Sequence, residues 1–191
     1  MSRIPAAPRS GLLIKLVDAY ARRRFGAVPE PVAVGAHHRR LMLAGGIHEM
    51  AVEKAATVLP AKLRELAVYQ VAVRVGCSWC VDFGTMLQRH HGLDIERLQH
   101  IHDYARSPLY TELERLALDY ALAMTSTPLS VTDEQVAELD SRLGHAGLLE
   151  LTYVIALENM RARNNHALGI TDQGFTSGDA CRVPQRLVPQ R

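Results

Sequence analysis

Apolar residues recur along this chain at the three- and four-residue spacing of α-helices, and no segment sustains the apolar–polar alternation of a half-buried strand. The stretch after Pro60 shows this most strongly, because Leu63, Ala67 and Val71 share one face of a helix. Aromatic residues make up only 5% of the chain, whereas Ala and Leu are abundant, which favours helices over sheets. The sequence therefore predicts an all-α fold.

Prolines and glycines divide the helical pattern into segments. The Gly45–Gly46 pair is expected to break a helix, and Gly76 is expected to end one in a left-handed conformation. Thr132 and Gln135 fit a capping box at the start of another helix. The expected helices span residues 10–25, 32–45, 47–58, 60–76, 80–91, 94–104, 110–124, 133–143 and 145–168.

Length and charge are those of one ordinary domain. Residues 1–172 are predicted to form it, with an irregular arm at 1–9, and residues 173–191 to be an extended or mobile tail. The net charge of +2, from 22 basic and 20 acidic residues, gives no reason to expect nucleic-acid binding. No apolar run approaches the ~20 residues that span a bilayer, and the first residues lack a signal-peptide pattern. A cytoplasmic protein without membrane contact is expected.

Cys77 and Cys80 stand two residues apart at the predicted start of a helix. The free N–H groups of a first helical turn favour negative charge, so a thiolate there is stabilised. Thiolate is the nucleophilic form of cysteine. Two intervening residues bring the sulfurs close enough for one to attack a substrate and the other to resolve the product as a disulfide. The pair therefore predicts redox chemistry.

Two other uses of these cysteines stay open. A structural zinc site needs four ligands, but Cys181 lies far away in the predicted tail and no histidine pair completes a site at the usual spacing, so no metal is expected. The cysteines could instead be inert core residues, because burial raises the pKa of a thiol. No Gly-x-Gly-x-x-Gly loop or P-loop is present, and no nucleotide, flavin or haem cofactor is expected.

Glu65 lies twelve residues before Cys77, with Tyr69 one helical turn further along the same face. If the two helices form an antiparallel hairpin, the Glu65 carboxylate can point at the sulfurs. A carboxylate in apolar surroundings has a raised pKa and can shuttle a proton. The alternative is a surface residue beside Lys62 and Arg64, since glutamate is seldom fully buried.

Glu65, the motif Cys77-Ser78-Trp79-Cys80 and the later stretch LENMRARNNHALGI resemble the carboxymuconolactone decarboxylase superfamily, and within it the alkylhydroperoxidase D-like branch. The resemblance extends from about residue 30 to residue 170. It implies an all-helical fold that assembles as dimers, trimers or hexamers. The apolar surface of the helices around the glycine pair and of the long last helix also favours a homo-oligomer.

The activity implied by this resemblance is that of a thiol-dependent peroxidase or disulfide reductase. Cys80 would be the attacking thiolate, Cys77 the resolving cysteine and Glu65 part of the proton relay. The substrate would be a small hydroperoxide or disulfide, and electrons would come from an external thiol donor such as a lipoyl or thioredoxin-like protein.

The chain departs from the family pattern at the relay histidine, expected four residues after the second cysteine, where it has Gly84. Candidates to replace it are Asp82, which is the nearest titratable residue, Tyr69, and His166 in the last helix. Activity is therefore expected to be weakened by the incomplete relay.

Trp79 and Phe83 are expected to shape an apolar mouth for an organic substrate, unless they simply pack in the core. Two rival functions also stay open: a non-catalytic redox sensor, and a decarboxylase-like lyase on the same scaffold. The intact dithiol argues against the lyase. A lyase would need a polar pocket, for which the dense candidates are Arg161, Arg163, Asn164, Asn165 and His166.

Overall fold

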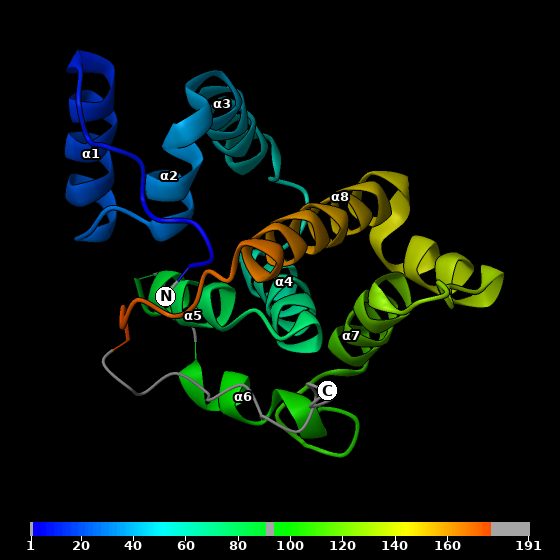
Figure 1. Cartoon of the computed structure of the whole chain (residues 1–191). Coiled ribbons are helices and arrows are strands. Elements are labelled where there is room, and N and C mark those ends of the chain that lie inside the picture. The colour runs from blue at the N-terminus through cyan, green and yellow to red at the C-terminus, as the bar shows by residue number, and fades with distance from the viewer. Residues whose placement is uncertain (1, 91–93, 177–191) are drawn as a thin grey trace.

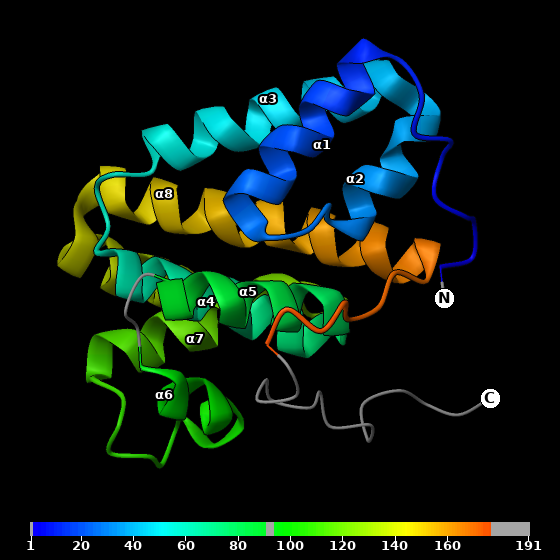
Figure 2. The same cartoon turned by 90° about the vertical axis from the view of Figure 1, so that its left-hand side faces the viewer.

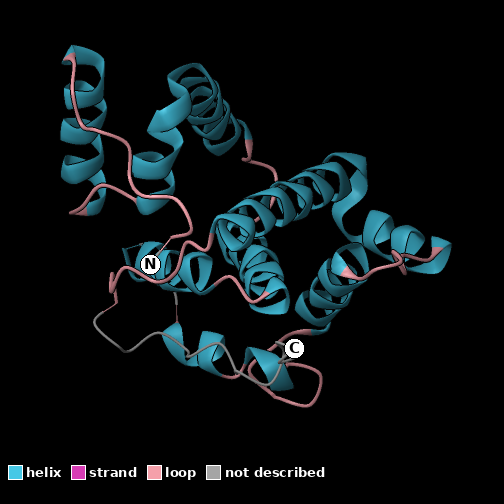
Figure 3. Cartoon of the chain, in the orientation of Figure 1, coloured by secondary structure: helices cyan, strands magenta, loops and turns pink. Residues whose placement is uncertain are grey.

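The computed structural model describes residues 2–90 and 94–176, and within these ranges every regular element is a helix (Figure 3). The all-α prediction is therefore confirmed. None of the described helices is both long and apolar enough to cross a membrane. The α-helices are α1 (Leu12–Phe25), α2 (Glu30–Gly35), α3 (Arg39–Ala55), α4 (Ala61–Val75), α5 (Ser78–His90), α6 (Ile95–Gln99), α7 (Glu112–Thr125) and α8 (Asp133–Leu168).

The long helix α8 lies between two groups of helices (Figures 1 and 2). The N-terminal helices α1 to α3 lie on one side of it, and α4, α5 and α7 lie on the other, with α6 beyond them. Within the N-terminal group, α3, all of whose residues are described, contains no buried residue, whereas Val34 of α2 packs in the core cluster that holds the cysteines. Most of the core and both cysteines belong to the α4, α5, α7 and α8 group.

Helix α4 is the centre of that group and is buried on two faces. Leu63, Ala67 and Val71 pack with apolar residues of α7 and α8. Leu66 and Tyr69 instead belong to the core cluster that contains both residues of the Cys77–Cys80 pair. The apolar stripe read from the sequence is thus confirmed, and the face beside it reaches the cysteines.

Several expected helix ends are confirmed. Gly76 ends α4 with φ of 79°, a left-handed conformation that glycine adopts without steric cost. Thr132 and Gln135 form the predicted capping box of α8. Gly144 interrupts α8 with φ of 69° and ψ of 167°, at the boundary between the two helices expected there.

The break expected at Gly45 and Gly46 is wrong, because α3 continues through both glycines. A glycine inside an exposed helix costs only about 1 kcal/mol relative to alanine, which a 17-residue helix tolerates. The chain breaks earlier, at His38, whose Nδ1 accepts the backbone N–H of Leu41 (3.2 Å) and caps α3. The cap at His38 therefore sets the start of α3.

Two further helix boundaries differ from expectation. Helix α5 begins at Ser78, so Cys80 lies inside its first turn. The helix expected over 94–104 ends at Gln99 and is followed by a separate 3₁₀ turn at Ile101–Asp103. Asp94 does cap this segment, since its side chain accepts the N–H of Glu96.

Candidate functional site

Cys77 and Cys80 form a disulfide at the start of α5, with their Cα atoms 5.3 Å apart. The backbone N–H of Cys80 donates to the Cys77 sulfur over 3.2 Å. This is the contact by which a first helical turn stabilises a thiolate. Only two residues join α4 to α5. Gly76 turns the chain, and Cys77 directly precedes α5.

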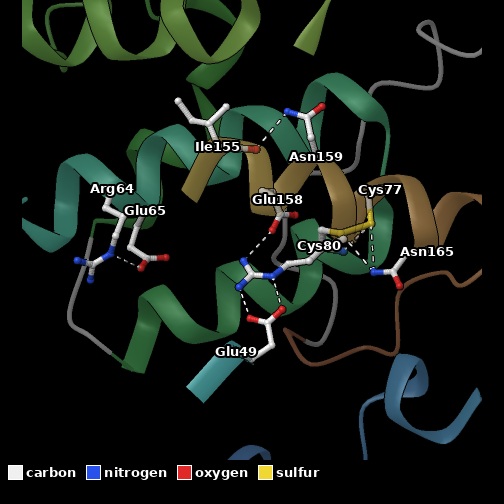
Figure 4. Close-up of polar contacts among 10 residues, drawn as sticks. Glu49, Arg64, Glu65, Cys77, Cys80, Ile155, Glu158, Asn159 and Asn165 are labelled. Atoms are coloured by element: carbon white, nitrogen blue, oxygen red, sulfur yellow. Dashed lines mark hydrogen bonds and ion pairs between the residues drawn. A yellow bond between two sulfur atoms is a disulfide. The ribbon is translucent and has the colours of Figure 1, made fainter. Parts of the chain in front are cut away.

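Both sulfur-bearing residues are buried, Cys77 to 2% exposure and Cys80 to 8%. Asn165 of α8 lies against both: its Nδ2 is 3.5 Å from the Cys80 sulfur and 3.8 Å from the Cys77 sulfur (Figure 4). An amide N–H is a hydrogen-bond donor to a thiolate. The site therefore offers a backbone donor and a side-chain donor to charge that develops on sulfur. Among the described residues, no three His, Cys, Asp or Glu side chains gather as a metal site would require.

Asn165 belongs to a stripe of α8 residues at positions three and four apart, all of them buried. Its other members include Ile155, Glu158 and Ala162. Glu158 is thus a carboxylate on the core face of the helix, 4% exposed. Burial is the main reason that the pKa of Glu158 rises to about 7, and the nearby carboxylates of Glu49 and Glu65 raise it further.

Arg161 joins Glu158 to the N-terminal helices. Its Nη1 donates to Glu158 Oε2 over 3.2 Å, while its Nε and Nη2 form a two-pronged pair with Glu49 of α3. The Nε contact is 2.9 Å long. The Arg161 charge opposes the rise in the Glu158 pKa without cancelling it. The geometry is that of one cation shared by two carboxylates (Figure 4).

Glu65 lies on α4 with its side chain 21% exposed, and one of its oxygens is 3.7 Å from Nε of Arg64. Its charge acts on the Glu158 carboxylate. The structure therefore brings the predicted relay glutamate near a second carboxylate that the sequence analysis did not single out. In Figure 4 the Glu158 carboxylate lies between Glu65 and the disulfide.

Gly84 leaves the position where the resemblance predicts a relay histidine without a side chain. A Cβ atom built there would be 3.7 Å from Cδ2 of Tyr69, which is ordinary contact. Tyr69 is buried, and its hydroxyl accepts a long hydrogen bond from Thr85 (3.5 Å). Tyr69 therefore lies beside the vacant relay position, on the helix that also carries Glu65.

Asp82, the expected substitute, binds the chain beyond α8. Its two oxygens accept the backbone N–H groups of Gln173, Phe175 and Thr176 and the hydroxyl of Thr176, over 2.8 to 3.1 Å. We call residues 172–176 the C-terminal strap. The first four residues of the predicted tail, 173–176, are thus fastened to α5, whereas Cys181 and the rest of the tail lie outside the described residues.

The aromatic residues of the motif helix contact the same strap. Trp79 stacks on Phe83 with ring centres 4.6 Å apart, and Phe83 also meets Phe175 of the strap and Phe25 of α1. The Trp79 indole N–H donates to Gln173 (2.8 Å). Trp79 is buried and Phe83 half-buried. The expected substrate mouth is therefore a packed aromatic group covered by the strap.

The residues considered for a lyase pocket point in different directions. Arg161 and Asn165 face Glu158 and the sulfurs. Arg163 and His166 line a separate open pocket of about 460 Å³ between the ends of α4, α7 and α8. His166 is exposed. These side chains do not converge on one site.

A model of the carboxymuconolactone decarboxylase family matches residues 46–123, which include Glu65 and both cysteines. This part of the chain is therefore similar to the carboxymuconolactone decarboxylase family. The uncharacterized protein YnjA of Escherichia coli (strain K12) is 28% identical to the chain over 183 residues, 96% of this chain and 98% of YnjA.

Several solved structures have a similar fold. A debrominase Bmp8 variant in complex with 2,3,4-tribromopyrrole superposes with a TM-score of 0.82 at 18% identity, covering 96% of this chain and 100% of Bmp8. An alkylhydroperoxidase AhpD core, an uncharacterized peroxidase-related protein of Ralstonia eutropha JMP134, gives a TM-score of 0.80 at 18% identity, over 96% and 98% of the two chains. At these identities the likeness concerns the fold.

Two residues of the site were missed by the sequence analysis, Glu49 and Glu158. No sequence motif marks either residue, but the helical spacing of the residues around Glu158 could have identified it as buried. Leu151, Ile155, Ala162 and Asn165 recur at helical spacing, and Glu158 completes that series. A carboxylate on the apolar face of a helix is either paired or functional, because an unpaired buried charge is costly.

Proposed function

We propose that this chain is a dithiol oxidoreductase that reduces a small electrophile, such as an organic hydroperoxide, and is itself reduced by an external thiol. The observation that carries the proposal is the Cys77–Cys80 disulfide at the start of α5, with the Cys80 N–H and the Asn165 amide directed at sulfur. Such donors lower the pKa of a thiol and keep it nucleophilic.

In the oxidative half-reaction, the Cys80 thiolate attacks the distal oxygen of a hydroperoxide. The O–O bond breaks, the alkoxide takes up a proton to leave as an alcohol, and Cys80 becomes a sulfenic acid. Cys77 then attacks the Cys80 sulfur, water leaves, and the disulfide forms. We assign the attack to Cys80 because it is the more exposed of the two. The protons pass through the neighbouring carboxylates of Glu65 and Glu158.

In the reductive half-reaction, a donor thiolate attacks the Cys80 sulfur and Cys77 leaves as a thiolate. The Cys80 N–H already contacts the Cys77 sulfur and stabilises that leaving group. A second donor thiol then releases reduced Cys80 as the donor's own disulfide forms. A lipoyl or thioredoxin-like dithiol has the chemistry required of the donor.

Single-cysteine variants test this proposal. Cys80→Ser is expected to abolish hydroperoxide-dependent oxidation of a dithiol donor. Cys77→Ser is expected to stop after one turnover with a sulfenic acid on Cys80, detected as a dimedone adduct by mass spectrometry. Cys181→Ser is the matched control and should behave as the unaltered protein. Turnover that persists in Cys80→Ser would remove the proposal.

Reductive dehalogenation is a second candidate, favoured by the shape likeness to the debrominase Bmp8. A dithiol can supply the two electrons: Ar–Br and two thiols give Ar–H, bromide, a proton and a disulfide. The stacked rings of Trp79 and Phe83 lie under the strap next to the cysteines, and a planar substrate that displaced the strap would meet aromatic faces there. Bromide release from brominated pyrroles, compared with alcohol formation from cumene hydroperoxide under the same conditions, separates the two activities.

A further inference from the structure

We infer that Glu158 is the proton carrier of the Cys77–Cys80 dithiol and takes the place of the histidine that Gly84 lacks. This inference rests on the proposed redox function and names the group through which its protons move. It assigns the task to α8, whereas the family pattern places it on α5.

The position of Glu158 on α8 is the first support. Glu158, Ala162 and Asn165 follow one another at four and three residues, so they share one face of the helix. Asn165 contacts both sulfurs, and Ala162 packs in the same core cluster as the two cysteines. The face of α8 that carries Glu158 is therefore the face turned to the dithiol, as Figure 4 shows.

The electrostatic surroundings are the second support. The charged groups that act on Glu158 are Arg161 on its own helix, Glu49 on α3 and Glu65 on α4. The Cys77–Cys80 disulfide of α5, which appears next to Glu158 in the view of Figure 4, carries no charge. Burial and two carboxylates favour its protonated form, one shared arginine favours its ionised form, and the pKa settles at about 7. Such a group both accepts and donates a proton at neutral pH.

The other candidates are less suited to the task. Asp82 accepts four hydrogen bonds from the C-terminal strap, and His166 lies exposed on another face of α8. Glu65 is less buried than Glu158, with a side chain 21% exposed.

The proton balance can be written for closure of the disulfide. When Cys80 holds a leaving group X as Cys80–S–X, the Cys77 thiol gives its proton to the Glu158 carboxylate. The Cys77 thiolate attacks the Cys80 sulfur, the S–S bond forms and X leaves with the bonding electrons. Glu158 then releases the proton to X or to water. With a hydroperoxide X is hydroxide, which leaves as water.

An aromatic disulfide, 5,5′-dithiobis(2-nitrobenzoate), tests this step without any peroxidase activity. In the reduced Cys181→Ser protein, whose only two thiols are those of the pair, the first thionitrobenzoate is released when Cys80 attacks and the second when Cys77 closes the disulfide, so the two phases are separate. Glu158→Gln is expected to slow the second phase at pH 7 by about tenfold or more and to remove its rise with pH near 7. The first phase should not slow, because glutamine carries no negative charge to oppose the thiolate.

Matched variants keep the outcome decisive. Glu134→Gln, exposed at the start of the same helix, should leave both phases unchanged, and Glu158→Asp should restore part of the closure rate. Glu49→Gln removes a charge that raises the Glu158 pKa and leaves Arg161 to Glu158 alone. Glu158 then ionises at lower pH, so the closure profile should move to lower pH by about half a unit or more.

The inference is overturned if closure in Glu158→Gln keeps the rate and pH profile of the unaltered protein, or if both phases slow equally. It is also overturned if Glu49→Gln leaves the profile in place. If the unaltered protein closes its disulfide with this reagent but reduces no hydroperoxide, the peroxidase proposal fails while the role of Glu158 is still decided by these variants.

Discussion

Glu158 and Asn165 occupy positions on α8 that the helical period assigns to the core. A buried carboxylate costs free energy unless it is paired, and Glu158 shares its single arginine with Glu49. The free-energy cost of burying the Glu158 carboxylate is explained if Glu158 must change its protonation state beside the cysteines. A fully satisfied structural ion pair would hold the pKa well below neutrality instead.

The raised pKa of Glu158 makes stability depend on pH. Its folded-state pKa of about 7 exceeds the ordinary 4.5, so the folded protein binds the extra proton between these values. The free energy of unfolding should therefore fall as the pH rises from 5 to 8, by up to about 3 kcal/mol for this group. Glu158→Gln should lack this loss. Urea unfolding at both pH values measures it, and an equal loss in Glu158→Gln would contradict the expectation.

Gly84 offers a test of the relay by restoration. Position 84 lies one helical turn after Cys80, on the same face of α5, and a Cβ atom fits there against Tyr69 at 3.7 Å. Gly84→His placed in the Glu158→Gln protein should recover the closure rate by about tenfold or more. Gly84→Ala in the same background is the control for the added Cβ. Equal rates in the two double variants would refute the restoration.

The C-terminal strap links α5 to the N-terminal helices through a few polar contacts. Gln173 accepts the Trp79 indole N–H and the backbone N–H of Glu30, and donates to the Val28 carbonyl. Asp82 accepts four further bonds from the strap. The helix that begins at the dithiol is therefore covered by a segment that follows α8 in the chain.

Asp82→Asn is expected to release the strap. An amide replaces one acceptor oxygen with an N–H₂ group that faces backbone donors, which costs about 2–3 kcal/mol. Because Trp79 is the chain's single tryptophan, its emission should shift to longer wavelength as the indole gains access to water. Asp172→Asn, with an exposed side chain in the same segment, should leave the emission unchanged. An unshifted spectrum in Asp82→Asn would show that the aromatic group holds the strap without Asp82.

Local signals predicted the helices well where the chain's own residues set their limits. The stripe of α4, the left-handed Gly76 and the Thr132 capping box all depend on residues close in sequence. The continuation of α3 through Gly45–Gly46 was not predicted. The low helix propensity of glycine is a weak effect, and the rest of a 17-residue helix that His38 caps outweighs it.

The candidate site was predictable only in its cysteines and in Glu65, which a motif and its spacing reveal. The partners of Asp82 and the Arg161 contact with Glu49 join residues about ninety or more positions apart. No local pattern encodes such contacts. Asn165 was noticed only as one of a polar run, although its place on the buried stripe of α8 distinguishes it from its neighbours.

Among the N-terminal helices, α3 is attached to α8 through polar side chains. Helix α3, described along its whole length, buries none of its residues, and it meets α8 through the Arg161–Glu49 pair and a 2.7 Å hydrogen bond between His48 and Tyr153. Large apolar side chains stay exposed on both helices and on α1. They are Leu12, Leu13, Leu16, Tyr20, Leu41, Ile47, Met50, Leu149, Tyr153 and Met160.

So much exposed apolar surface on adjoining helices is typical of a protein interface, and we expect a second copy of this chain to cover it. Light scattering after size exclusion should give a small multiple of the mass of one chain. Ile47→Glu, at 64% exposure on α3, should lower that mass, whereas Leu129→Glu, at 71% exposure outside these helices, should not. A monomeric unaltered protein would contradict the expectation.

The same assembly bears on the proton carrier. A partner seated on α3 and α8 would exclude water from the Arg161–Glu49 pair next to Glu158. Burial is the largest cause of the raised Glu158 pKa, so dissociation should lower that pKa. Closure of the disulfide in Ile47→Glu should then keep its rate to lower pH than in the assembled protein, while Leu129→Glu keeps the original profile. If the Ile47→Glu protein dissociates but the pH profile of disulfide closure does not move, the raised pKa of Glu158 arises within a single chain and not from the assembly.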